Sequence, residues 1–314
     1  MNTTLRTPEN LAAAAIMRHH GRSFHWAGGL LPAEVRLRCA RLYAICRAVD
    51  DLADLPVGAD ERHVSMTRLE DLIEAISDRD TTDPLVADAA RLFQSDARTW
   101  HALEQLAMTA HDDIGPVRIA NEDGLYAYAD GVAGTVGEMM AEILNASRHA
   151  EARIAARELG IAMQYTNIAR DVLEDAESDR LYLPADWLGA EVTPAAITAG
   201  EARARAAAWQ AVLNLLDRAE DVYNRAWRGL PCLPPRARLG IAVAAHVYRR
   251  IGVRIRARGP ERYWQRRCRV GTAGKLLATA RGVGLFLRAS GVHAPGGARG
   301  TRRPLPHTGR NGQQ

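Results

Sequence analysis

Apolar residues recur along most of the chain at intervals of three or four positions rather than two. Between about residues 33 and 53, for example, Leu42, Cys46, Val49 and Ala53 fall on one stripe of a helix. Leu, Ala, Arg and Glu, which favour helices, are abundant throughout. Proline and glycine clusters at 31–32, 54–58, 115–116, 121–124, 183–184 and 231–235 separate the periodic segments. The pattern predicts an all-α protein with no sheet.

Composition indicates a globular chain of one large or two modest domains, and the lack of a long polar linker or a repeat favours a single domain. The chain has 314 residues, of which 47% are hydrophobic and 25% charged, so it can bury a sizeable core. We expect residues 1–15 to be an N-terminal extension, 16–290 one domain, and 291–314 a disordered basic tail. The longest apolar run, 276–287, is interrupted by Arg281 and too short to span a bilayer, so a cytoplasmic location is expected. The four cysteines are expected to be reduced thiols.

Positive charge is concentrated near the end of the predicted domain. Residues 249–275 contain ten Lys or Arg residues and one acid, Glu261. Tyr263 and Trp264 lie among them. Two interpretations stay open: a surface for an anionic membrane or nucleic acid, and a solvated helix face.

An acidic pattern on the helix predicted at 33–53 indicates the first candidate site. At about 100° per residue, Tyr43, Arg47, Asp50 and Asp54 fall within about 60° of one another. This polar stripe lies beside the apolar stripe, which is typical of side chains that line an internal cavity. The alternative is a solvated face with an ordinary network of ion pairs.

A second helix repeats this construction. Gln164, Asn167, Asp171 and Asp175 fall within about 80° of one another. Magnesium prefers oxygen ligands and commonly completes its shell with water and substrate phosphates. Two such stripes facing one another would form a magnesium and diphosphate site. Arg170 lies about 100° from the Asp171 stripe, so helical geometry by itself places it at the core edge or the surface.

Four segments together resemble the head-to-head prenyl synthases, the squalene and phytoene synthase family. They are residues 43–54, 128–137, 164–175 and 180–184, and they keep the order and spacing of that family. The resemblance runs from about residue 20 to 275 and is greatest to the bacterial phytoene synthases. It implies an isoprenoid-synthase-type helical bundle around a central cavity, with the two aspartate-rich helices on opposite walls.

The resemblance also implies roles for particular residues. The implied metal ligands are Asp50, Asp54, Asn167, Asp171 and Asp175, with magnesium as the ion and manganese as the alternative. The implied substrate-binding residues are His20, Arg22, Ser23, Tyr43, Arg47, Gln164, Arg170 and Tyr248. The expected catalytic set is Asp50, Asp54, Asp171, Asp175, Tyr43 and Tyr248. Asp130 departs from the family pattern, because an acid is unexpected near a hydrocarbon tunnel.

Glycines at positions 131, 134 and 137 recur at every third residue of a helical stretch. They permit either tight helix packing or a locally opened helix beside the prenyl chain, and both interpretations stay open.

The activity implied is the condensation of two geranylgeranyl diphosphates through a cyclopropyl diphosphate to phytoene, without NADPH. The alternatives are a synthase of 30-carbon products from farnesyl diphosphate and, in another class, a basic helical protein that binds nucleic acid or lipid. We expect prenyl diphosphates as ligands, no nucleic acid, and a peripheral association with the inner membrane. The oligomeric state is left open.

Overall fold

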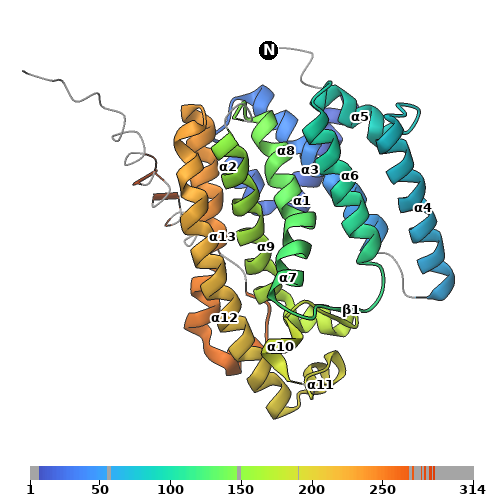
Figure 1. Cartoon of the computed structure of the whole chain (residues 1–314). Helices are drawn as coiled ribbons and strands as arrows, with labels where there is room; N and C mark the ends of the chain where they lie inside the picture. Colours follow the sequence, from blue (N-terminus) through green and yellow to red (C-terminus); the bar gives the residue numbers. More distant parts are fainter. Residues whose placement is uncertain are drawn as a thin grey trace, which may run out of the picture.

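The chain folds into a bundle of helices, as predicted from its periodicity (Figure 1). The computed structural model describes residues 7–54, 58–146, 150–189 and 191–268, and seven single positions between 271 and 286. The α-helices are α1 (Pro8–His20), α2 (Arg22–Gly28), α3 (Ala33–Asp54), α4 (Ala59–Asp78), α5 (Pro84–Phe93), α6 (Ala97–Asp112), α7 (Glu122–Ala129), α8 (Thr135–Ile143), α9 (Ala150–Glu177), α10 (Ala185–Leu188), α11 (Pro194–Ala199), α12 (Ala202–Ala226) and α13 (Pro235–Tyr263). A π-helix, η2 (Asp130–Gly134), joins α7 to α8, and a 3-10 helix, η3 (Trp227–Cys232), follows α12.

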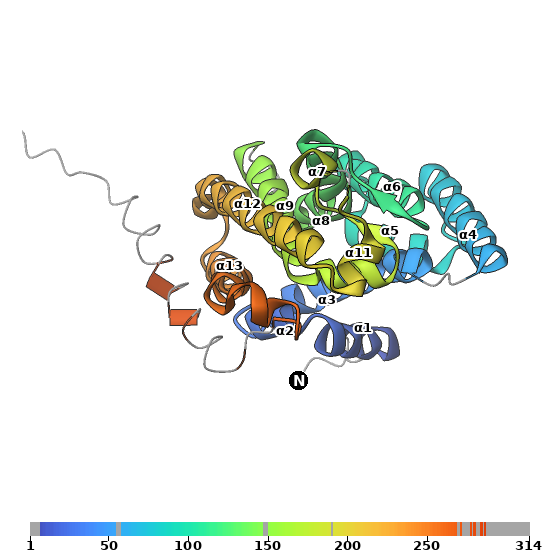
Figure 2. The same cartoon turned by 90° about the horizontal axis from the view of Figure 1, so that it is seen from below.

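Helix α9 is the centre of the bundle and packs against α8, η2, α12, α13 and η3. One buried cluster joins α9, α12 and α13, and a second joins α3, α6 and α8. Viewed from below, α2 lies beside α13, and α1 lies on the other side of α2, next to α3 (Figure 2). The aspartate-rich helices α3 and α9 thus belong to different halves of the core.

A small sheet contradicts the prediction that no strand is present. Strand β1 (Val117–Arg118) pairs in parallel with β2 (Arg180–Leu181). Strands of two residues carry no periodic signal, which explains why the sequence pattern did not reveal them. The pairing joins the segment after α6 to the segment after α9, and it brings Arg180 towards the end of α3.

Helix α1 belongs to the bundle. It begins after Thr7, whose hydroxyl caps the helix by accepting from the Asn10 N–H, and it buries Ala13 and Met17 against α3. The boundary predicted at residue 15 therefore falls within a continuous helix. The predicted tail, 291–314, lies outside the described residues.

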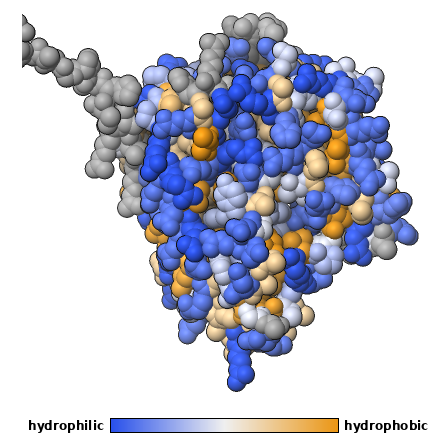
Figure 3. Space-filling model, viewed as in Figure 1, coloured by the Kyte–Doolittle hydropathy of each residue, from blue (hydrophilic) through white to orange (hydrophobic). Residues whose placement is uncertain are grey.

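The described surface is largely hydrophilic, with apolar residues in small scattered groups on the face shown in Figure 3. Among the described residues, no helix is long and apolar enough to cross a membrane. The four cysteines are free thiols in this structure, and Cys39, Cys46 and Cys268 are buried.

Candidate active site

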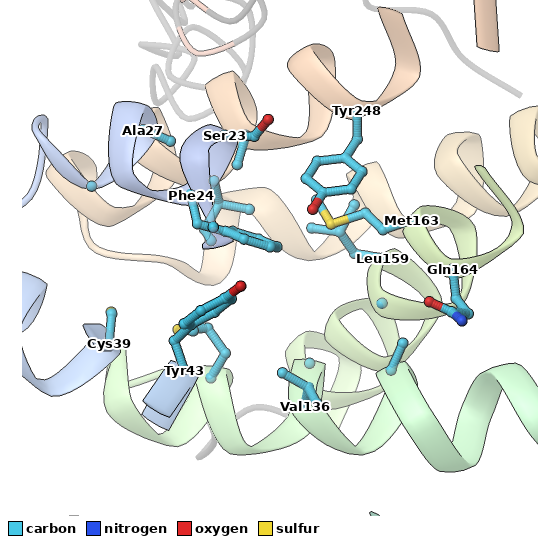
Figure 4. A pocket seen from close by; sticks show the side chains of 18 of the residues that line it. Ser23, Phe24, Ala27, Cys39, Tyr43, Val136, Leu159, Met163, Gln164 and Tyr248 are labelled. Atoms are coloured by element: carbon cyan, nitrogen blue, oxygen red, sulfur yellow. The ribbon is translucent and has the colours of Figure 1, made fainter. Parts of the chain in front are cut away.

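A cavity of about 1360 Å³ lies between the two halves of the bundle, with walls from α2, α3, η2, α8, α9, η3 and α13. Figure 4 shows Tyr43, Phe24, Tyr248 and Gln164 around it. Nine of the residues predicted for the site line the cavity: His20, Ser23, Tyr43, Arg47, Asp50, Gln164, Asn167, Arg170 and Tyr248. The cavity is therefore lined by part of each polar stripe: Tyr43, Arg47 and Asp50 on α3, and Gln164 and Asn167 on α9. The acids Asp54, Asp171 and Asp175 are not among its lining residues.

The lining changes from apolar to polar along α9. Its cavity-facing residues from Ala152 to Met163 are apolar or small, whereas Gln164, Asn167 and Arg170 follow towards its C-terminus. At 1.5 Å per residue, the apolar part is about 17 Å long. The cavity thus has an apolar end and a polar end, as an amphipathic ligand requires.

Glycines let α9 approach the opposite wall closely. A Cβ atom at Gly160 would lie 2.0 Å from the carbonyl oxygen of Ala133, and one at Gly137 would lie 2.0 Å from that of Ala156. The same stretch contains the π-helix η2. The packing is therefore tight and the helix is locally widened, whereas the contact of this stretch with a prenyl chain stays a prediction.

The first aspartate motif lies at the C-terminal end of α3. Asp50 lines the cavity, and its pKa is raised to about 7, first by burial and then by the charge of Asp54. Arg47 forms ion pairs with Asp51 and, at 3.8 Å, with Asp54. Asp54 is exposed and accepts a hydrogen bond from Arg180 at 3.1 Å.

The second motif is held by arginines. Asp171 accepts hydrogen bonds from Arg170, at 2.7 Å for its Nε, and from Arg267 at 2.8 Å. Burial, followed by the charge of Asp171, raises the pKa of Asp175 to about 8. Arg170 lines the cavity, a position that the helical wheel did not assign to it.

Asp113, which the sequence analysis did not predict, lies close enough to both aspartate motifs for its charge to affect them. Its carboxylate accepts hydrogen bonds from Tyr182 at 2.8 Å and Tyr128 at 3.3 Å. Burial raises its pKa to about 6, and its charge in turn raises the pKa values of Asp50 and Asp175. Asp113 directly follows α6 in a turn. Its sequence signal was only a pair of acids before a Gly-Pro turn.

Several buried oxygen atoms that could bind a divalent metal lie at or near this end of the cavity. The Asn167 side chain donates to Gln164 Oε1 at 3.2 Å, which leaves its own buried Oδ1 with no hydrogen-bond partner in the described part of the chain. The carboxyls of Asp50, Asp113 and Asp175 have raised pKa values, partly through mutual repulsion that a cation would relieve. Among the described residues, no three acids, histidines or cysteines are grouped closely enough to hold a metal by themselves. A divalent metal held here would have to take further ligands from water and phosphate.

The basic segment at 249–275 contributes to the cavity. Arg254, Arg258, Arg266 and Arg267 line it, and Arg258 donates to the backbone oxygen of Arg266 at 2.9 Å. Of the described residues that line the cavity, Asp50 is the one acid. These arginines therefore face the cavity, which neither interpretation of the basic segment foresaw. The side chain of Arg22, another predicted contact, lies outside the described part of the structure.

A helical bundle around an amphipathic cavity, with acidic motifs on two facing helices, defines an isoprenoid-synthase type of enzyme. The profile of the family described as "Squalene/phytoene synthase" matches residues 17–273. The chain belongs to this family, as its motifs predicted.

Relatives and solved structures agree with this assignment. The chain is 34% identical over 302 residues to a 15-cis-phytoene synthase of Enterobacter agglomerans, covering 90% of this chain and 98% of the relative. It is 33% identical to a phytoene synthase of Pseudescherichia vulneris, covering 88% of this chain and 92% of the relative. A crystal structure of a dehydrosqualene synthase has the same fold, with a TM-score of 0.73, 23% identity, and coverage of 90% of this chain and 97% of the other.

Proposed function

We propose that this protein is a phytoene synthase, which condenses two geranylgeranyl diphosphates head to head and releases diphosphate. The observation that carries the proposal is the cavity that joins an apolar stretch of α9 to an end lined by arginines, polar side chains and the carboxyl group of Asp50. A diphosphate fits the polar end and a prenyl chain the apolar end. The phytoene synthases among its relatives support the same conclusion.

Arginines would bind the diphosphates directly, and carboxylates would bind them through metal ions. Arg47, Arg170 and Arg267 point charge-assisted donors at this end of the cavity, where they can stabilise the negative charge that develops as a C–O bond breaks. Asp50, Asp54, Asn167, Asp171 and Asp175 would hold magnesium, with manganese as the alternative. The bound metal would supply Lewis-acid stabilisation of the departing diphosphate.

Aromatic side chains would protect and stabilise the allylic cation that remains. Phe24 lies 5.3 Å from Tyr248 and 6.2 Å from Tyr43, measured between ring centres. Burial raises the pKa of Tyr43 to about 12 and also raises that of Tyr248, so both phenols stay neutral. Their role is then to present ring faces to the cation and to exclude water, rather than to act as resting bases.

The reaction proceeds in two stages. In the first, the double bond of the second substrate attacks the cation of the first, and loss of a proton closes a cyclopropane ring. In the second, the remaining diphosphate departs, the carbon skeleton rearranges, and loss of another proton gives the central double bond of phytoene. No hydride is consumed, so NADPH is not required.

The test is an incubation of the purified protein with geranylgeranyl or farnesyl diphosphate, with magnesium or EDTA and with or without NADPH. The expected result is phytoene from the 20-carbon substrate, dependent on magnesium and independent of NADPH. A 30-carbon product would move the substrate to farnesyl diphosphate. No product from either substrate would refute the assignment.

We also propose a cytoplasmic protein that associates peripherally with the inner membrane. A 40-carbon hydrocarbon needs an apolar acceptor, and Leu11, Trp26 and Leu30 expose apolar side chains on or just after α1 and α2. Sedimentation with anionic liposomes should carry the protein down at low salt. Protein that stays in the supernatant at every salt concentration would refute the association.

A further inference from the structure

An ion-pair network lies behind the cavity wall and ties three elements to α9. Arg157 of α9 donates from Nε to Asp130 Oδ1 at 2.9 Å and from Nη2 to Asp130 Oδ2 at 2.6 Å. Its Nη1 donates to Glu138 Oε2 at 2.6 Å, and its Nη2 to Gln105 Oε1 at 3.1 Å. The side chains of Arg157, Asp130 and Glu138 are only 25%, 19% and 15% exposed. None of the four residues lines the cavity, so Asp130, unexpected near a hydrocarbon, turns away from it.

Asp130 is the first residue of the π-helix η2, a conformation that proteins use rarely and mostly at functional sites. The N–H of Thr135 bonds the carbonyl of Asp130, five residues earlier. The buried Thr135 hydroxyl donates to the carbonyl of Gly131 at 2.7 Å. The Asp130 carboxylate folds over Gly134, where a Cβ atom would lie 2.2 Å from its Oδ1. The π-turn is therefore held by contacts specific to this local sequence.

The cavity wall depends on the register of this turn. Val132, Ala133 and Val136 line the cavity from η2 and α8, whereas Tyr128, on α7, bonds Asp113 beside the aspartate motifs. A π-turn holds about one residue more than an α-turn. If η2 became regular α-helix, one flank would turn by about 100° relative to the other. Either Tyr128 would leave Asp113, or the apolar wall would change its shape.

Arg157 opposes that change through its charge as well as its hydrogen bonds. It lies between two partly buried carboxylates, and removing it would leave Asp130 and Glu138 without this cation between them. We infer that Arg157 is a positioning residue, which fixes the register of η2 and thereby keeps the cavity wall and Tyr128 in place between the two stages of the reaction. This inference rests on the proposed function for its effect on products.

The first measurement is the ratio of cyclopropyl diphosphate to phytoene released with geranylgeranyl diphosphate and magnesium. Arg157→Gln should raise this ratio at least fivefold, while KM and the magnesium concentration for half-maximal rate change less than twofold. Arg157→Lys keeps the charge but loses the forked geometry, so it should give a smaller rise. Arg225→Gln is the matched control. Arg225, on α12, forms an ion pair with Glu158, the residue that follows Arg157 on α9. Breaking this ion pair should leave the product ratio unchanged.

The second measurement is hydrogen exchange of the η2 amides, which needs no substrate. Faster exchange in residues 128–137 of Arg157→Gln or Arg157→Lys, with unchanged exchange in residues 164–175, is expected. The inference would be overturned if the variants exchanged their η2 amides at the wild-type rate. It would also be overturned if their Tm fell while their ratio of cyclopropyl diphosphate to phytoene stayed at the wild-type value. If the wild-type protein forms no prenyl product, the proposed function fails, and exchange still decides whether Arg157 holds the π-turn. A folded Arg157→Lys protein keeps the test valid if Arg157→Gln does not fold.

Discussion

Metal binding should strengthen steeply between pH 6 and pH 8, because two predicted ligands have raised pKa values. The pKa of Asp175 is about 8 and that of Asp50 about 7. From these values, about 1% of the Asp175 carboxyls are ionised at pH 6 and about half at pH 8, and the ionised share of Asp50 rises from about 9% to about 91%. A metal binds the carboxylate form. Affinity should therefore rise by up to about 50-fold through Asp175 and about tenfold through Asp50.

The assay is titration of the protein with Mn²⁺ at pH 6, 7 and 8, with free Mn²⁺ measured by electron paramagnetic resonance. Diphosphate is left out, so that its own titration does not contribute. In Asp175→Asn, the Mn²⁺ affinity should rise between pH 6 and pH 8 only by the roughly tenfold factor that the ionisation of Asp50 contributes. Asp217→Asn, which alters an exposed acid paired with Arg256, should keep the wild-type rise. Equal wild-type affinity at pH 6 and pH 8 would refute the reasoning, as would an unchanged rise in Asp175→Asn.

Three further predictions concern the same residues and their supports. Asp50 and Asp175 hold protons more tightly in the folded chain than at their ordinary pKa of 3.8, so the stability that they contribute is present below about pH 4 and is lost as the pH rises through 7 and 8. The Tm of the metal-free protein should therefore fall between pH 5 and pH 8, and a constant or rising Tm would contradict this. Asp50→Asn or Asp171→Asn should abolish turnover with an unchanged circular dichroism spectrum, and retained magnesium-dependent activity in both would defeat the site assignment. Gly160→Ala should lower the free energy of unfolding by about 1–3 kcal/mol in urea titrations, because its Cβ would meet the Ala133 carbonyl; a wild-type midpoint would contradict that contact.

Much of the site was predictable because it lies on long helices. Tyr43, Arg47, Asp50, Gln164 and Asn167 share helix faces that a rotation of 100° per residue defines, and all five line the cavity. The all-α fold was predictable for the same reason, and the family match confirms the motif-based assignment. Local periodicity, which depends only on neighbouring residues, was sufficient to predict the helices and the residues that share a face, whereas the family assignment came from the resemblance of the motifs.

The tertiary structure decided which distant groups meet. Asp113 follows a helix in a turn, and it joins the site because α6 ends beside Tyr182 and Arg180, which the short pairing of β1 and β2 positions. Arg267 belongs to the basic segment, for which the sequence left two interpretations open. In the folded chain it lines the cavity and forms ion pairs with Asp171 and Glu174 of α9. Contacts of this kind depend on how helices pack across the core, which the pattern along one helix does not contain.

The role of Asp130 shows the same division. The sequence by itself determined that an acid lies in a glycine-rich helical stretch near the predicted cavity. Only the packing of η2 against α9 decided that this acid turns away from the cavity and pairs with Arg157, 27 residues later. The physical reason is that a partly buried charge is stable where a partner of opposite charge reaches it, and the position of that partner is a property of the folded chain.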